Sequence, residues 1–294
     1  MSVFSLSNYQ NFKIFFTFLL LWFSVQFGDF IEDVVAYFLV ITLGILHGAN
    51  DLLIISKNDK RKQQFYKNLS IYITIIVICL LIYLFKPMLA ILLFIIISAY
   101  HFGEEHLSEL VDISKYFNFF YYISYGGLIF SIIFFNSLND VNQILDQLVG
   151  GSFTKNQITF SLSFSLLIFL LTNSYLLIAK KIDAKQLLKE LFYLLLLALV
   201  FKSTSLILGF AIYFILWHSL PSIIHQVVFI SGNFSKKSIW FYIKQAFIYW
   251  VISILSMLIL YIFIPQLEQF SIVVFVILFA VTAPHVWVMH RMKN

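Results

Sequence analysis

The sequence predicts an all-α membrane protein, a polytopic bundle of about ten transmembrane helices with both termini in the cytoplasm. Three observations lead to this prediction: the composition, the spacing of the apolar runs and the distribution of basic residues. Hydrophobic residues make up 61% of the 294 residues and charged residues only 11%. A soluble core would need charged helix faces recurring every seven residues or so, and the run from Ile71 to Phe85 has no charge at all.

Apolar runs long enough to cross roughly 30 Å of hydrocarbon follow one another along the chain. They cover residues 12–27, 34–56, 69–86, 88–107, 117–135, 158–179, 187–202, 204–230, 241–264 and 270–290. We expect one helix from each run, all in a single membrane domain over residues 1–294. The longest connection, Asn136 to Gln157, is expected as an external loop without recognisable chemistry.

Basic residues set the expected orientation, because short cytoplasmic loops carry most of the positive charge. With ten alternating helices and the N-terminus inside, sixteen basic residues fall inside and only Lys86, Lys155 and Lys202 fall outside. Anionic lipid at the cytoplasmic face accounts for the net charge of +5, so no nucleic-acid partner is expected. We therefore expect a multi-pass protein of the cell's inner (plasma) membrane.

The seven histidines all lie in the second, fourth, eighth and tenth apolar runs. They are His47; His101 and His106; His218 and His225; and His285 and His290. In the expected topology these four helices run from outside to inside, and each has its first histidine just past its middle. Four imidazoles at one depth indicate a single metal site. The alternative is four separate interhelical hydrogen bonds, which we would favour for one histidine alone.

Two carboxylates are candidate catalytic or supporting groups of this site. Asp51 follows His47 by four residues, and Glu105 follows His101 by four, so each shares a helix face with its histidine. Each is expected to accept the second ring N–H of that histidine, or to bind the metal itself.

Other polar residues have less defined expected roles. His225, seven residues after His218, and Glu104 are possible additional ligands or supporting groups, whereas His106 and His290 are expected at the cytoplasmic interface. Imidazoles with carboxylates and no thiolate suit Fe(II), Zn, Cu or Mn, and open coordination positions favour O₂ chemistry at iron.

The motifs around these histidines resemble those of a known family. His47-Gly48-Ala49 with Asp51, His101-Phe102-Gly103-Glu104, Trp217-His218-Ser219 and Pro284-His285 are similar, in the same order, to motifs of the Brp/Blh family of membrane β-carotene dioxygenases. Members of this family are found in microbes with retinal-based rhodopsins. The resemblance covers nearly the whole chain.

This resemblance implies cleavage of the central double bond of β-carotene by O₂ at Fe(II), giving two all-trans-retinal molecules that a microbial rhodopsin could use. It also implies that His47, His101 and His218 are iron ligands. Some members have a further histidine where this chain has Ser222. The fourth ligand is therefore open, and His285 or His225 could supply it.

The abundant aromatic residues suit a polyene dissolved in the bilayer, because they could line a long apolar tunnel. The aromatic residues next to the proposed ligands are Tyr100, Phe102, Tyr213, Trp217 and Trp287. For any one of them, ordinary packing is the simpler interpretation. Two other functions stay open, a bis-histidine haem protein and a membrane metal or ion transporter. A di-iron desaturase is less favoured, because its closely spaced histidine boxes are absent.

Overall fold

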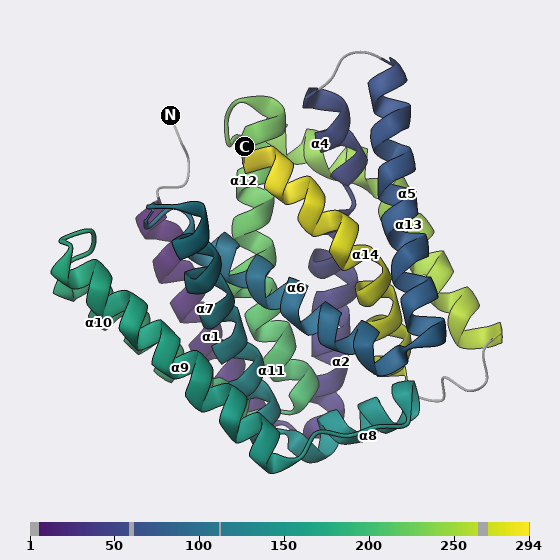
Figure 1. The fold of residues 1–294 in the computed structure, drawn as a ribbon. Coiled ribbons are helices and arrows are strands. Elements are labelled where there is room, and N and C mark those ends of the chain that lie inside the picture. The colour runs from purple at the N-terminus through teal and green to yellow at the C-terminus, as the bar shows by residue number, and fades with distance from the viewer. Residues whose placement is uncertain (1–5, 59–61, 112, 264–269, 294) are drawn as a thin grey trace.

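A computed structural model describes residues 6–58, 62–111, 113–263 and 270–293, and this part of the chain is helical without β-strands (Figure 1). Each of the ten apolar runs falls on a helix or on a series of successive helical elements. Eight runs correspond to single helices: α1 (Leu6–Gln26), α5 (Lys62–Phe85), α6 (Pro87–Leu107), α7 (Lys115–Asn136), α9 (Lys155–Ile178), α10 (Ala184–Ser203), α13 (Lys236–Phe263) and α14 (Phe270–Lys293).

The second and eighth runs are composite, and each contains a π-helical stretch. The second comprises α2 (Asp29–Leu39), η1 (Val40–Gly44), α3 (Ile45–Gly48) and α4 (Asp51–Asn58). The eighth comprises α11 (Leu206–Ile212), η2 (Tyr213–Ser219) and α12 (Leu220–Ser231). Widened π turns of this kind occur frequently at functional sites.

Seven of the described helical segments are long and apolar enough to cross a membrane. They are Asp29–Lys57, Gln63–Phe85, Pro87–Leu107, Lys115–Asn136, Lys155–Ile178, Leu206–Ser231 and Lys236–Ile259. Their outer faces carry large apolar side chains such as Leu84, which is 71% exposed, as expected for contact with lipid. The chain is thus a helical membrane protein, while the total of ten crossings and the orientation stay predictions.

A helix also forms where we expected only a loop. Residues Leu138–Val149 fold into α8, whose apolar side chains Val141, Leu145 and Leu148 are buried while its polar side chains face outward. Gly150 ends the helix in the left-handed conformation, at φ +62°, which glycine adopts without a steric penalty. Figure 1 shows α8 across the end of the bundle opposite the start of α1 and the end of α14.

The helices α6 and α7 pack closely against each other, and glycine makes that contact possible. A Cβ atom added at Gly103 would lie 1.9 Å from the carbonyl oxygen of Tyr122, and one added at Gly126 would lie 1.9 Å from that of Ala99. The two backbones therefore touch directly, as in other membrane helix pairs with small residues four apart. This contact fixes the position of α6, which carries His101.

Candidate metal centre

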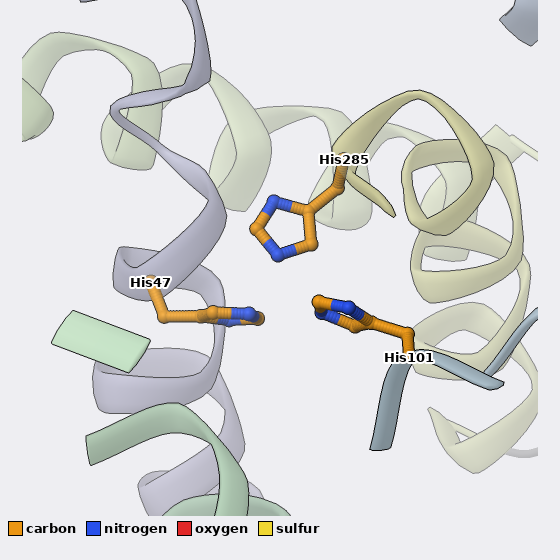
Figure 2. Close-up of side chains that lie close together, drawn as sticks. All are labelled: His47, His101 and His285. Atoms are coloured by element: carbon orange, nitrogen blue, oxygen red, sulfur yellow. The ribbon is translucent and has the colours of Figure 1, made fainter. Parts of the chain in front are cut away.

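Three buried histidines from distant parts of the sequence converge inside the helical bundle. His47 on α3, His101 on α6 and His285 on α14 each offer a ring nitrogen, and these nitrogens lie within 4.8 Å of one another. Figure 2 shows the three rings directed toward a common point. Their residues are at most 5% exposed. This group is close enough to bind one metal ion.

The ring of His218 completes a four-membered arrangement. Its centroid lies 5.2 Å from that of His47 and 4.8 Å from that of His101, while His285 lies 4.4 Å from His47 and 5.3 Å from His101. The structure thus brings together the four histidines that the sequence placed at one depth. His218 lies on η2, which contacts η1 just before His47. Gly44 permits this contact, because a Cβ there would lie 2.8 Å from the Phe214 ring.

The His47 ring is held in one tautomer by its own helix. Nδ1 lies 2.9 Å from the carbonyl oxygen of Gly44. Because a carbonyl can only accept a hydrogen bond, Nδ1 carries the proton and Nε2 keeps a free lone pair. This is the state that a metal ligand requires.

Asp51 holds the His285 ring in the same way. The Asp51 Oδ1 atom accepts a hydrogen bond of 2.8 Å from His285 Nδ1, and Oδ2 accepts one of 3.1 Å from the Tyr72 hydroxyl. Our expectation that Asp51 accepts from His47 was therefore wrong. The turn at Ala49 and Asn50 separates α3 from α4, so counting four residues along one helix does not apply here.

The remaining ring nitrogens test whether a metal fits. Among the described residues, His47 Nε2, His285 Nε2, both nitrogens of His101 and Nδ1 of His218 are buried without a hydrogen-bond partner. Burying a polar atom without a partner costs on the order of 1–3 kcal/mol, and native proteins rarely tolerate several together. A metal ion would satisfy one nitrogen of each ring, so the donor set fits.

Glu105 takes part in a charged network near the ends of α6 and α14 that also includes His225 on α12, and this differs from the predicted pairing with His101. Its oxygens lie 2.9 Å from His225 Nδ1 and 3.1 Å from Lys293 Nζ. His225 Nε2 lies 3.1 Å from Glu109, and this hydrogen bond lowers the pKa of the Glu109 carboxyl. With an acidic oxygen at each nitrogen, both ring nitrogens of His225 donate, which leaves neither free for a metal.

Glu104, rather than Glu105, is the carboxylate near His101. One of its oxygens lies 3.9 Å from His101 Nδ1, and the other accepts a 3.1 Å hydrogen bond from the Tyr100 hydroxyl. His290 Nδ1 lies 3.3 Å from the same oxygen, with its side chain 55% exposed at the edge of the network. Glu104 therefore links His101 to this charged network.

His106 and Ser222 lie outside the group of four rings. The His106 ring is mostly buried, 2.6 Å from Glu190 and stacked on Tyr125 at a centroid distance of 4.5 Å. Ser222, fully buried, accepts a hydrogen bond of 3.2 Å from Gln226, whose Nε2 also lies 2.9 Å from the carbonyl oxygen of His47. Ser222 thus belongs to the packing behind His47.

Of the five predicted aromatic residues, Phe102 is the one whose ring contacts a histidine of the group. A further aromatic residue beside the histidines was not predicted from the sequence. The Phe102 ring lies 4.7 Å from His218, and Tyr213 packs on Phe102. Trp217 instead donates to Thr17 and lies under the Lys13 ammonium group. Trp287 packs under Arg291.

The missed residue is Phe214, whose ring lies 5.7 Å from both His47 and His218. Its position four residues before His218 could have indicated this contact, because residues four apart on a helix lie on the same face. Phe102 and Phe214 together give the group of histidines an apolar wall.

Comparisons with known proteins agree with the motif resemblance. A model of the beta-carotene 15,15'-dioxygenase family matches residues 38–293, a range that includes all four histidines. Searches of curated proteins and of solved structures gave no match.

Proposed function

The chain belongs to the beta-carotene 15,15'-dioxygenase family, and from this premise we propose that it cleaves the central double bond of β-carotene with O₂ to give two all-trans-retinal molecules. We propose that Fe(II) is held by His47, His101, His218 and His285. The observation that carries this proposal is the convergence of four buried rings that keep partnerless nitrogens.

Hydrogen bonding supports one choice of the fourth ligand. His225 uses both ring nitrogens on Glu105 and Glu109, whereas His285 donates from Nδ1 to Asp51 and has Nε2 free among the described residues. We therefore propose that His285 supplies the fourth ligand, in place of the further histidine that some members have at the position of Ser222. Asp51 acts through His285, by fixing its tautomer and raising its basicity.

The protein's own residues hold, orient and shield the reaction site. Iron would supply the binding and activation of O₂ next to the double bond, a reaction that side chains alone do not perform. Phe102 and Phe214 present apolar faces beside His218, which suits a hydrocarbon substrate and excludes water. Because β-carotene is dissolved in the bilayer, a site at the centre of a helical membrane bundle is in the same phase as its substrate.

The proposal is tested in a bacterium engineered to make β-carotene. Expression of the chain should bleach the orange pigment and yield retinal, because central cleavage halves the conjugated system. His47→Ala, verified in the membrane at the same level, is the control that should leave the pigment intact. Unchanged pigment with iron-loaded wild-type protein would rule out β-carotene as the substrate.

A second measurement separates iron from haem. Purified protein should contain iron without a Soret band, since four imidazoles packed edge to face leave no flat slot for a porphyrin between two of them. A Soret band that disappears in His47→Ala would instead support a haem protein. Metal flux into vesicles without any product from carotene would support a transporter.

A further inference from the structure

A separate apolar cavity of about 150 Å³ lies between the group of histidines and α8. Side chains of α2, η1, α6, α7, α8, α11 and α14 line it, and all of them are apolar apart from Tyr37. None of the aromatic residues predicted from the sequence to line a substrate tunnel is among them. The residues used below are Ile95 on α6, Phe130 on α7, Leu145 on α8 and Phe210 on α11.

Two short series of aromatic contacts connect this cavity to the histidines. Phe210 stacks on Phe214 at 5.3 Å, and Phe214 lies 5.7 Å from His218. On the other side, Phe130 stacks on Phe102 at 5.4 Å, and Phe102 lies 4.7 Å from His218. Each series has only two steps, so the walls of the cavity and of the candidate metal centre are continuous.

The cavity is closed on its far side by α8. Leu145 and Leu148 face inward, and the Tyr83 hydroxyl of α5 donates to the carbonyl oxygen of Leu148, which ties α8 to the bundle. The chain after α8 is fixed too, because Asn142 exchanges two hydrogen bonds with the backbone of Phe153. The cavity is thus closed on the side of α8, while another part of it opens to the surroundings of the bundle.

We infer that this cavity seats one end ring of the carotenoid while the central double bond lies beside the histidines. This inference rests on the proposed function and adds to it a binding site for the cyclic end group. Dry apolar cavities of about 150 Å³ hold a single benzene-sized ring, so the volume suits one methylated ring rather than a whole polyene. A closed end also sets the distance from the seated ring to the metal centre, and this distance determines which double bond is presented.

The test compares two neighbouring positions on α6. Ile95 lines the cavity, whereas Ile96 is 49% exposed on the outer face, so Ile95→Phe and Ile96→Phe make the same chemical change inside and outside the cavity. Leu145→Phe on α8 fills the cavity from the other side and serves if Ile95→Phe does not fold. The probe is β-ionone, a methylated ring with a short chain, added to metal-free protein in detergent.

β-Ionone should raise the midpoint of thermal unfolding of the wild type and of Ile96→Phe, but not of Ile95→Phe or Leu145→Phe. With iron and β-carotene, Ile95→Phe should lower kcat/KM about tenfold or more and give unequal apocarotenals, because a ring that cannot seat shifts the polyene along its axis. Ile96→Phe should give retinal only, with the same iron content as Ile95→Phe.

The outcomes separate this inference from the proposed function. An equal β-ionone shift in Ile95→Phe and Ile96→Phe, or none in the wild type, would overturn the end-ring site even if the wild type cleaves β-carotene. The proposed function would be refuted, and an apolar ring site supported, by a different result. In that case β-ionone raises the unfolding midpoint except in Ile95→Phe and Leu145→Phe, but the iron-loaded wild type does not cleave β-carotene.

Discussion

Two of the four histidines are held by acceptor groups in the tautomer that a metal ligand needs. Gly44 fixes His47 through a backbone carbonyl, and Asp51 fixes His285 through a carboxylate. By contrast, both ring nitrogens of His101 and Nδ1 of His218 are buried without a hydrogen-bond partner among the described residues. The proposed ligands therefore fall into two pairs. Hydrogen bonds fix the tautomer of His47 and His285, whereas metal binding itself would determine which nitrogen of His101 and His218 carries the proton.

Removing a proposed ligand should remove iron. His47→Ala, His101→Ala, His218→Ala and His285→Ala should each abolish cleavage and lower the iron content of the purified protein, because each deletes one nitrogen donor. His290→Ala is the matched control, since its ring is mostly exposed and lies on Glu104 outside the group. Full iron retention in all four ligand variants would refute the metal centre.

Changing the carboxylate behind a ligand should have a smaller effect. Asp51→Asn removes the negative charge that orients His285, so iron affinity or activity should fall by about 10–100-fold without being abolished. Tyr72→Phe removes only the hydrogen bond to the other carboxylate oxygen and should cost less. Titration of metal-free protein with Fe(II), followed by a rate measurement, checks both; an Asp51→Asn variant indistinguishable from the wild type would contradict this role.

The sequence predicted which histidines meet but not which carboxylate partners each one. The matching depths of the histidines in four separate apolar runs sufficed to predict which ones meet, because the ligands of one ion must lie at one level. The partners depend on turns that apolar periodicity does not reveal: a break at Ala49–Asn50 redirects Asp51 to His285. Glu105 forms ion pairs with His225 and Lys293, which come from distant segments of the sequence.

The contact between α6 and α7 should be sensitive to a single methyl group. Gly126→Ala places a Cβ against the carbonyl oxygen of Ala99, where only a backbone shift relieves the clash. Overpacking of this kind costs on the order of 1–3 kcal/mol, and a shifted α6 also displaces His101. We expect a lower midpoint of thermal unfolding together with reduced iron content.

Gly28→Ala is the control for this change, because a Cβ at Gly28 meets no atom within 4 Å among the described residues. Equal unfolding midpoints for Gly126→Ala and Gly28→Ala would show that the two helices do not rely on backbone contact.

The helix α8 shows what a hydropathy scan for membrane helices overlooks. Its apolar positions Leu138, Val141, Leu145 and Leu148 recur with helical spacing, so the pattern was present in the sequence. The segment is too short to span a membrane, and its mixed composition favoured a loop. Only the assembled bundle reveals that its apolar face closes a cavity.

The whole molecule has an arrangement that fits an even number of crossings. Figure 1 shows the start of α1, the end of α4 and the end of α14 at one end of the bundle and α8 at the other. Seven described helices meet the length and apolarity needed to span a membrane, and the three other apolar runs are helical as well. The expected orientation rests on the basic loops, because positive charge in short loops favours the cytoplasmic side.

Reporter fusions test this orientation directly. Fusions after Lys62 and after Lys185 should be active only as cytoplasmic reporters, and one inserted at Gly151, after α8, should be active only outside. The physical reason is the charge bias: with ten crossings, sixteen basic residues lie inside and three outside. Losing one helix would move whole basic loops to the wrong side. An external signal at Lys185 would therefore refute the ten-helix arrangement, while leaving the group of four histidines and its iron content to be judged by the ligand variants.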